Sequence, residues 1–134
     1  MRLLHCIPGA LLLLNICGCA GLNSRPGNAL AITAIEPASP ARLKLGERML
    51  VHIHYSVTNA DPVIILARPY THGEKTDGYN AHPSYRYPAG SGDIVGWFYF
   101  DTPARVQEVR VDMLTARTRQ PVASISQAIN ASWQ

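Results

Sequence analysis

The stretch Met49–Val57, which reads Met-Leu-Val-His-Ile-His-Tyr-Ser-Val, alternates apolar and polar side chains with a period of two. Successive side chains of a β-strand point to opposite faces of a sheet, so this alternation predicts a strand with one buried and one wetter face. The residues expected on the buried face are Val51, Ile53, Tyr55 and Val57, and those expected on the other face are His52, His54 and Ser56.

Five further segments indicate strands. Val106–Met113 and Ala123–Trp133 repeat the period of two, although Ala123–Trp133 also fits a helical stripe. Its interleaved Ser and Asn residues favour the strand. Ala29–Ile35 is expected to be the first strand, and Val63–Ala67 and Ile94–Phe100 are continuous apolar runs. We expect these two runs to be central strands, covered on both faces or covered on one face by a loop.

Turn residues separate these segments, and no segment predicts a long amphipathic helix. The pattern predicts an all-β fold, a β-sandwich of about seven strands over residues 29–134. The Pro-rich opening Pro37–Pro40, the turn at Gly46 and the alternating strand that follows resemble immunoglobulin-like and fibronectin type III-like modules of bacterial surface proteins. This resemblance implies an immunoglobulin-like β-sandwich with Trp97 as its core aromatic residue. A partly open barrel is the alternative architecture.

The amino-terminal segment carries the features of an export signal. A short positive end, Met1–His5, precedes an apolar run that falls short of the roughly 20 residues that span a membrane. The run leads into Ile16–Cys19, Ile-Cys-Gly-Cys, which resembles the lipobox of bacterial lipoproteins. The resemblance implies a signal peptide over residues 1–18, diacylglycerol on the sulfur of Cys19, and a further acyl chain such as palmitate on the new amino terminus. In such families, Ala20-Gly21 in place of Asp implies an outer-membrane destination.

The lipobox divides the chain into a signal peptide, a lipidated tether over residues 19–28 and a domain over residues 29–134. We expect the protein to lie in the cell envelope, where its lipid anchors it at the outer membrane and the domain faces the periplasm or the surface. An ordinary secretory signal cleaved elsewhere and a buried apolar amino terminus are the alternatives. The three cysteines, Cys6, Cys17 and Cys19, all lie before the domain. The domain therefore has no disulfide, thiol nucleophile or Cys-ligated metal site and depends on its hydrophobic core.

Composition argues against nucleic-acid binding and catalysis. The formal net charge is only +3, and the Lys and Arg residues are scattered singly instead of forming an electrostatic footprint. Gly90-Ser91-Gly92 lacks the strand-turn-helix context of a nucleophile elbow, and the nine acidic residues lie singly. We therefore expect a protein that is not an enzyme and needs no cofactor.

His52 and His54 are the candidates for a metal site. On a strand their rings project from the same face, about 7 Å apart at the Cα atoms, and could fill two corners of a coordination sphere. His72 and His82, from a loop, are the possible further ligands. The simpler interpretation is a solvent-facing strand, and no metal-binding motif strengthens the pair. The sequence therefore predicts no metal centre.

The segment Arg68–Gly92 predicts a recognition surface. It contains four of the six tyrosines together with two histidines and two arginines. Tyr and Arg are favoured at binding hot spots, and long connections in compact domains are often functional. Alternatively, Tyr70 and Tyr79 cover the end of the sandwich, and Ser84–Tyr87 forms an edge strand. The candidate binding residues are Arg68, Tyr70, His72, Tyr79, Tyr85, Arg86 and Tyr87.

These features predict a non-enzymatic envelope lipoprotein whose membrane-tethered β-sandwich binds an envelope protein or a cell-wall polymer. One alternative is a sugar- or peptidoglycan-binding module, in which Tyr79, Tyr85 or Tyr87 stacks on pyranose rings. Another is an inhibitor of an exported hydrolase such as lysozyme, and a third is a metal-binding protein that uses His52 and His54.

Overall fold

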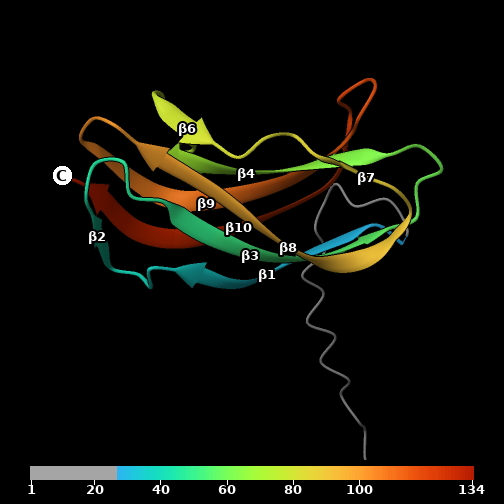
Figure 1. Cartoon of the computed structure of the whole chain (residues 1–134), viewed down its shortest axis with the longest axis horizontal. Helices are drawn as coiled ribbons and strands as arrows, with labels where there is room; N and C mark the ends of the chain where they lie inside the picture. Colours follow the sequence, from blue (N-terminus) through green and yellow to red (C-terminus); the bar gives the residue numbers. More distant parts are fainter. Residues whose placement is uncertain (1–26) are drawn as a thin grey trace, which may run out of the picture.

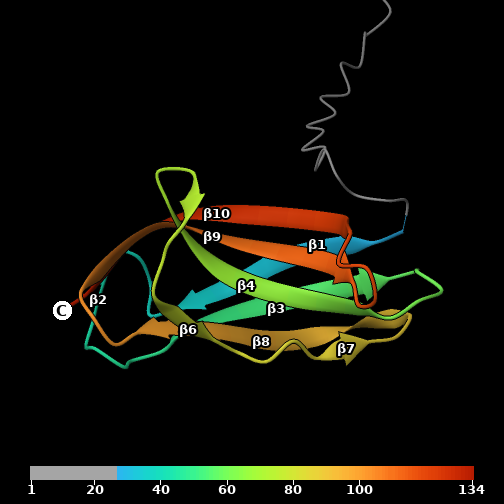
Figure 2. The same cartoon turned by 90° about the horizontal axis from the view of Figure 1, so that it is seen from above.

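The computed structural model describes residues 27–134, which form two packed β-sheets (Figure 1, Figure 2). The first sheet has the strand order β1 (Ala29–Glu36), β3 (Met49–Val57), β8 (Gly90–Phe100) and β6 (Tyr79–Ala81). The second has the order β2 (Ala41–Leu43), β10 (Pro121–Trp133), β9 (Ala104–Thr115), β4 (Val63–Thr71) and β5 (Glu74–Lys75), and β7 (Arg86–Tyr87) also pairs with β4. Residues 27–134 contain no helix of the length and apolarity that crossing a membrane requires.

This strand order is that of an immunoglobulin-like sandwich. In that fold, strands A, B, E and D form one sheet and strands C, F and G form the other. Here β1, β3, β8 and β6 take the places of A, B, E and D, and β4, β9 and β10 take those of C, F and G. The predicted all-β immunoglobulin-like sandwich is therefore confirmed. The structure has ten strands instead of seven because the short strands β2, β5 and β7 add pairings at the edges of the second sheet.

The strand predicted at Met49–Val57 has these same bounds in the structure, as β3. Val51, Ile53 and Val57 are buried, and Tyr55 is half-buried against the core. His54 on the other face is exposed, so the predicted alternation is confirmed. The ambiguous segment at the carboxyl end is strand β10 and not a helix.

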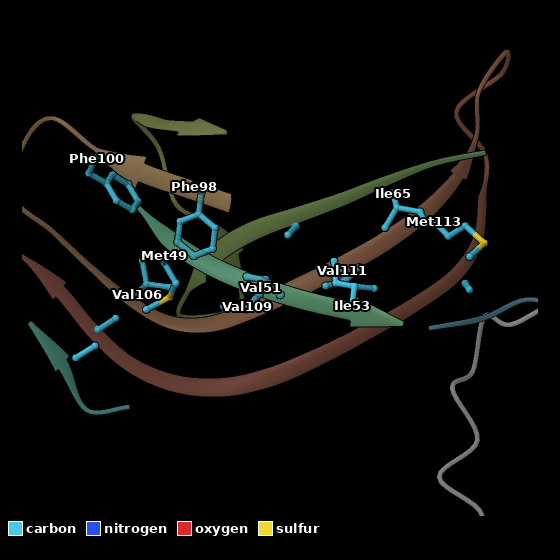
Figure 3. Packing of buried hydrophobic residues seen from close by; sticks show 14 of the residues in the cluster. Met49, Val51, Ile53, Ile65, Phe98, Phe100, Val106, Val109, Val111 and Met113 are labelled. Atoms are coloured by element: carbon cyan, nitrogen blue, oxygen red, sulfur yellow. The ribbon is translucent and has the colours of Figure 1, made fainter. Parts of the chain in front are cut away.

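The core lies between the two sheets and is built mainly from β3, β4, β8, β9 and β10 (Figure 3). Its largest side chain is Trp133, which is 1% exposed. The Trp133 ring lies 4.9 Å from that of Phe100 and 5.9 Å from that of Phe98, measured between ring centroids. The indole Nε1 donates a hydrogen bond of 2.9 Å to the carbonyl oxygen of Glu47, so the one polar atom of this side chain is also satisfied.

The prediction that Trp97 is the core aromatic residue is wrong. Strand β8 directs Phe98 and Phe100 into the core, so the alternation of the strand turns Trp97 and Tyr99 outward. The run Ile94–Phe100 is apolar on both faces, and an unbroken apolar run does not show which face of its strand lies inside.

Candidate interaction surface

The segment Arg68–Gly92 is not one loop. The chain leaves β4, turns back at His72-Gly73 into β5, crosses to the first sheet as β6 and returns to β4 as β7. His72 and Gly73 have φ values of 52° and 78°, which is the pattern of a two-residue type I′ hairpin turn. The predicted binding residues are therefore spread over several strands and a turn.

These residues lie in two groups at opposite ends of β4. Tyr70 lies at one end of the strand, while Tyr87 pairs with Val63 at the other. Tyr70 lies seven positions after Val63, a distance of roughly 20 Å along a strand. One ligand of ordinary size does not contact both groups, so the segment does not form a single compact surface.

Arg68 and His82 occupy the edge of β4 in the gap between β5 and β7. The backbone N–H of Ala67 donates to His82 Nε2 at 3.1 Å, and Arg68 Nη1 donates to the carbonyl oxygen of Ala67 at 2.9 Å. Both backbone groups of Ala67 are thus satisfied without a neighbouring strand, which protects an edge that would otherwise pair with another chain. The structure therefore gives Arg68 a structural contact.

The His82 imidazole is held in its neutral form. Nε2 accepts from Ala67, so the ring proton lies on Nδ1, which donates to the carbonyl oxygen of Pro83 at 2.9 Å. Burial lowers the pKa of His82 below its ordinary value of 6.5; the hydrogen bond to Pro83 opposes this shift, and the charge of Arg68 adds to it. Protonation of Nε2 would remove the acceptor of the Ala67 N–H.

We expect the free energy of unfolding to fall as the pH is lowered from about 7.5 to about 5. Because the His82 pKa is lowered in the folded state, the unfolded chain takes up the proton first, and the loss begins near pH 6.5 and continues toward the folded-state pKa. His82→Gln retains an acceptor for Ala67 but does not titrate, so its unfolding free energy should depend less on pH. Urea denaturation of both proteins across this range measures the difference; equal pH slopes would contradict the role of His82.

The remaining predicted residues differ in exposure. Tyr79 packs against the core, and Tyr87 lies against Tyr55 with ring centroids 5.1 Å apart, so these two tyrosines cover the ends of the sandwich. Tyr85 is 60% exposed. On the second sheet, the ring centroid of Tyr70 lies 3.9 Å from the guanidinium carbon of Arg110. Arg86 and His72 are exposed.

The two candidate metal-ligating histidines lie on the outer face of the first sheet. His52 Nε2 is 3.1 Å from Glu36 Oε2, and His54 Nδ1 is 2.8 Å from Asp93 Oδ1, so each ring pairs with a carboxylate of a neighbouring strand. The proposed further ligands do not join them, because His72 lies in the β4–β5 turn and His82 at the edge of β4. Within residues 27–134, no group of three or more His, Cys, Asp or Glu side chains is placed to hold a metal ion.

The outer face of the first sheet also carries large apolar side chains that stay partly exposed. Strand β8 presents Val95, which is 48% exposed, together with Trp97 and Tyr99, and Leu50 of β3 is the register partner of Trp97. The Trp97 and Tyr99 rings stack with centroids 6.0 Å apart and planes inclined by 23°. The guanidinium carbon of Arg48 lies 3.7 Å from the Trp97 ring centroid. We call these five residues, Arg48, Leu50, Val95, Trp97 and Tyr99, the aromatic face.

The sequence prediction missed the aromatic face, although its signal was present in Ile94–Phe100. The two Phe residues of β8 have no polar atom and point inward, whereas Trp97 and Tyr99 carry a polar atom at the ring edge and point outward. This difference in side-chain chemistry indicates which residues of the strand point inward. The apolar character alone does not indicate it.

Comparison with known proteins adds no assignment: no protein-family model matches the chain, and no curated protein matches it. The predicted signal peptide, the lipidation site Cys19 and nearly all of the tether lie outside the described residues 27–134. Function is therefore inferred from the chemistry of the described surfaces together with the predicted lipobox.

Proposed function

We propose that this protein is a non-enzymatic, lipid-anchored envelope protein whose β-sandwich binds a protein partner through the aromatic face. The observation that carries the proposal is the partly exposed set Val95, Trp97 and Tyr99 on the solvent side of an antiparallel sheet. That side is ordinarily polar, and apolar patches on it mark interaction sites. Burial of apolar area contributes about 25 cal/mol per Å², and Trp, Tyr and Arg are enriched at binding hot spots.

The position of the first described residues leaves the aromatic face free to meet a partner. Asn28 accepts a hydrogen bond of 2.8 Å from the Thr58 N–H and donates one of 3.0 Å to Asn59, so the chain enters beside the β3–β4 loop (Figure 1). Trp97 pairs with Leu50 near the opposite end of β3. A tether from Cys19 to Asn28 spans at most roughly 30 Å. An anchor at Cys19 therefore holds the entry end near the membrane and leaves the aromatic face toward the other end.

A protein partner fits the aromatic face better than a cell-wall sugar does. Sugar stacking uses an open aromatic ring face, whereas the Arg48 guanidinium already lies over the Trp97 ring. Of the three tyrosines considered for sugar stacking, Tyr79 and Tyr87 are half-buried against neighbouring side chains, which leaves Tyr85. One exposed tyrosine is not a platform of coplanar rings. An exported hydrolase would be one class of protein partner.

Replacing Trp97 and Tyr99 together by Ser should abolish capture of the partner from the native envelope. Both side chains point away from the core, so the free energy of unfolding should fall by only about 1–2 kcal/mol. The measurement is a cross-linking pull-down with the lipidated protein, with captured proteins quantified by mass spectrometry in wild type and variant.

The matched control is Tyr70→Ser, which removes a partly exposed tyrosine from the outer face of the second sheet. This control should capture the same partner as the wild type. Capture of that partner by the Trp97 and Tyr99 double variant at the wild-type level would contradict the proposal, and so would retention of the wild type by purified cell wall with no protein captured.

A further inference from the structure

A second surface, separate from the aromatic face, lies where β2, β9 and β10 meet in the second sheet. A cavity of about 480 Å³ opens there, which is within the range of small-ligand pockets. No Asp or Glu lines it. The lining residues are Pro40, Ala41, Arg42, Arg105, Asn130, Ser132 and Gln134.

Arg42, Ser132 and Arg105 form one row across three neighbouring strands. The parallel pairing of β2 with β10 sets Ser132 beside Arg42, and the antiparallel pairing of β10 with β9 sets it beside Arg105. Adjacent strands are about 4.8 Å apart, so the two arginine Cα atoms lie about 10 Å apart with Ser132 between them. Ala131 and Trp133 are buried, so Ser132 points to the outer face, and both long arginine side chains can reach a group bound above it.

Hydrogen bonds hold the walls of the cavity in place. The backbone N–H of Asn130 donates to Ser39 Oγ at 2.9 Å, and that of Gln134 donates to the carbonyl oxygen of Leu43 at 3.0 Å. These two bonds connect β10 to Ser39 before β2 and to Leu43 at the end of β2, on either side of Ser132. The row is therefore formed before a ligand binds, which lowers the entropic cost of binding.

The two arginines give the row its positive charge. Within residues 27–134, neither the Arg42 nor the Arg105 guanidinium has an ion pair or a side-chain hydrogen bond, whereas Arg110 pairs with Glu108 at 3.2 Å. Ser132 Oγ accepts a hydrogen bond of 3.4 Å from Gln134 Nε2, so its own proton remains available to donate. Two guanidinium groups, a hydroxyl and the Asn130 amide thus offer donors to one anion.

We propose that this cavity binds the phosphate group of a phosphomonoester. A phosphomonoester carries close to two negative charges at neutral pH, which matches the two guanidinium groups, whereas a monocarboxylate neutralises only one. The guanidinium fork also binds phosphate oxygens bidentately. The same group occurs in small soluble phosphomonoesters and on membrane lipids, and the test separates these sources.

The test is calorimetric titration of the purified protein at low ionic strength with inorganic phosphate, glycerol 3-phosphate and acetate. Both phosphate probes should bind, and acetate should bind at least about tenfold more weakly. Arg42→Gln and Arg105→Gln should each weaken phosphate binding by about tenfold. Arg117→Gln removes the same charge from an exposed turn away from the cavity and should leave binding unchanged. Unchanged thermal unfolding would show that the variants are folded.

A second arm identifies the source of the phosphate. Sedimentation with phosphatidic acid vesicles, compared with phosphatidylcholine vesicles, should depend on Arg42 and Arg105 if the phosphate belongs to a lipid, whereas binding of the soluble probes alone indicates a soluble ligand. No binding of either soluble phosphate probe, acetate binding as tight as phosphate binding, or an equal loss in Arg117→Gln would overturn the proposal.

Discussion

Replacing Trp133 by Ala should lower the free energy of unfolding by about 3–5 kcal/mol, the range for removing a large aromatic side chain from a core. Trp133 is 1% exposed and contacts both Phe98 and Phe100 across the interface between the sheets. The substitution leaves a cavity that these two rings only partly fill, and it removes the hydrogen bond to the Glu47 carbonyl oxygen. Urea denaturation of both proteins gives the difference.

The other tryptophan of the chain provides the matched control. Trp97→Ala removes an identical side chain from the outer face of β8, where the residue is only partly buried. Its cost should be about 1 kcal/mol, because no closed cavity forms. Equal losses for the two variants, or a larger loss for Trp97→Ala, would contradict the assignment of Trp133 as the core aromatic residue.

Replacing Gly96 by Val should destabilise the fold by about 3 kcal/mol or more, at the upper end of overpacking costs. A Cβ atom at Gly96 would lie 2.9 Å from the Cβ of Ala67 on the facing sheet and 3.0 Å from His82 Nε2. The larger side chain therefore pushes β8 and β4 apart and displaces His82, which then loses its hydrogen bond with the Ala67 N–H. Thermal and urea unfolding both report the effect.

Ser91→Val, on the same strand, is the control for Gly96→Val. Ser91 is exposed and valine is favoured in strands, so the free energy of unfolding should stay within about 0.5 kcal/mol of the wild type. A Gly96→Val protein as stable as the wild type would show that the two sheets do not approach as closely at this position as the structure describes.

The fold class was predictable because single strands carry their own pattern. The alternation of Met49–Val57 predicts both the strand and its buried face, and the structure confirms both. Strand β8 lacks that contrast, since apolar residues occupy both of its faces, and its sequence alone does not distinguish Trp97 from Phe98 and Phe100 as the inward residues. Where the alternation of apolar and polar residues is weak, pairing with the neighbouring strands determines which face of a strand points into the core.

The surfaces were less predictable because they depend on register between distant strands. Arg42, Arg105 and Ser132 are far apart in sequence and become neighbours only through the pairing of β2, β10 and β9. His82 is similar: its position in the chain gives no sign that it caps the Ala67 N–H at the edge of β4. The recognition surface expected over Arg68–Gly92 rested on composition, which does not show that β4 separates Tyr70 from Tyr87.

The most direct test of the interaction surface is site-specific photo-cross-linking in the native envelope. A photoreactive residue at Val95, which is 48% exposed on the aromatic face, is compared with one at Ser126, which is exposed on the opposite sheet. We expect one dominant protein adduct from position 95 that is absent from position 126 and is lost when Tyr99 is replaced by Ser. No adduct from position 95, or the same adducts from both positions, would contradict a binding role for the aromatic face.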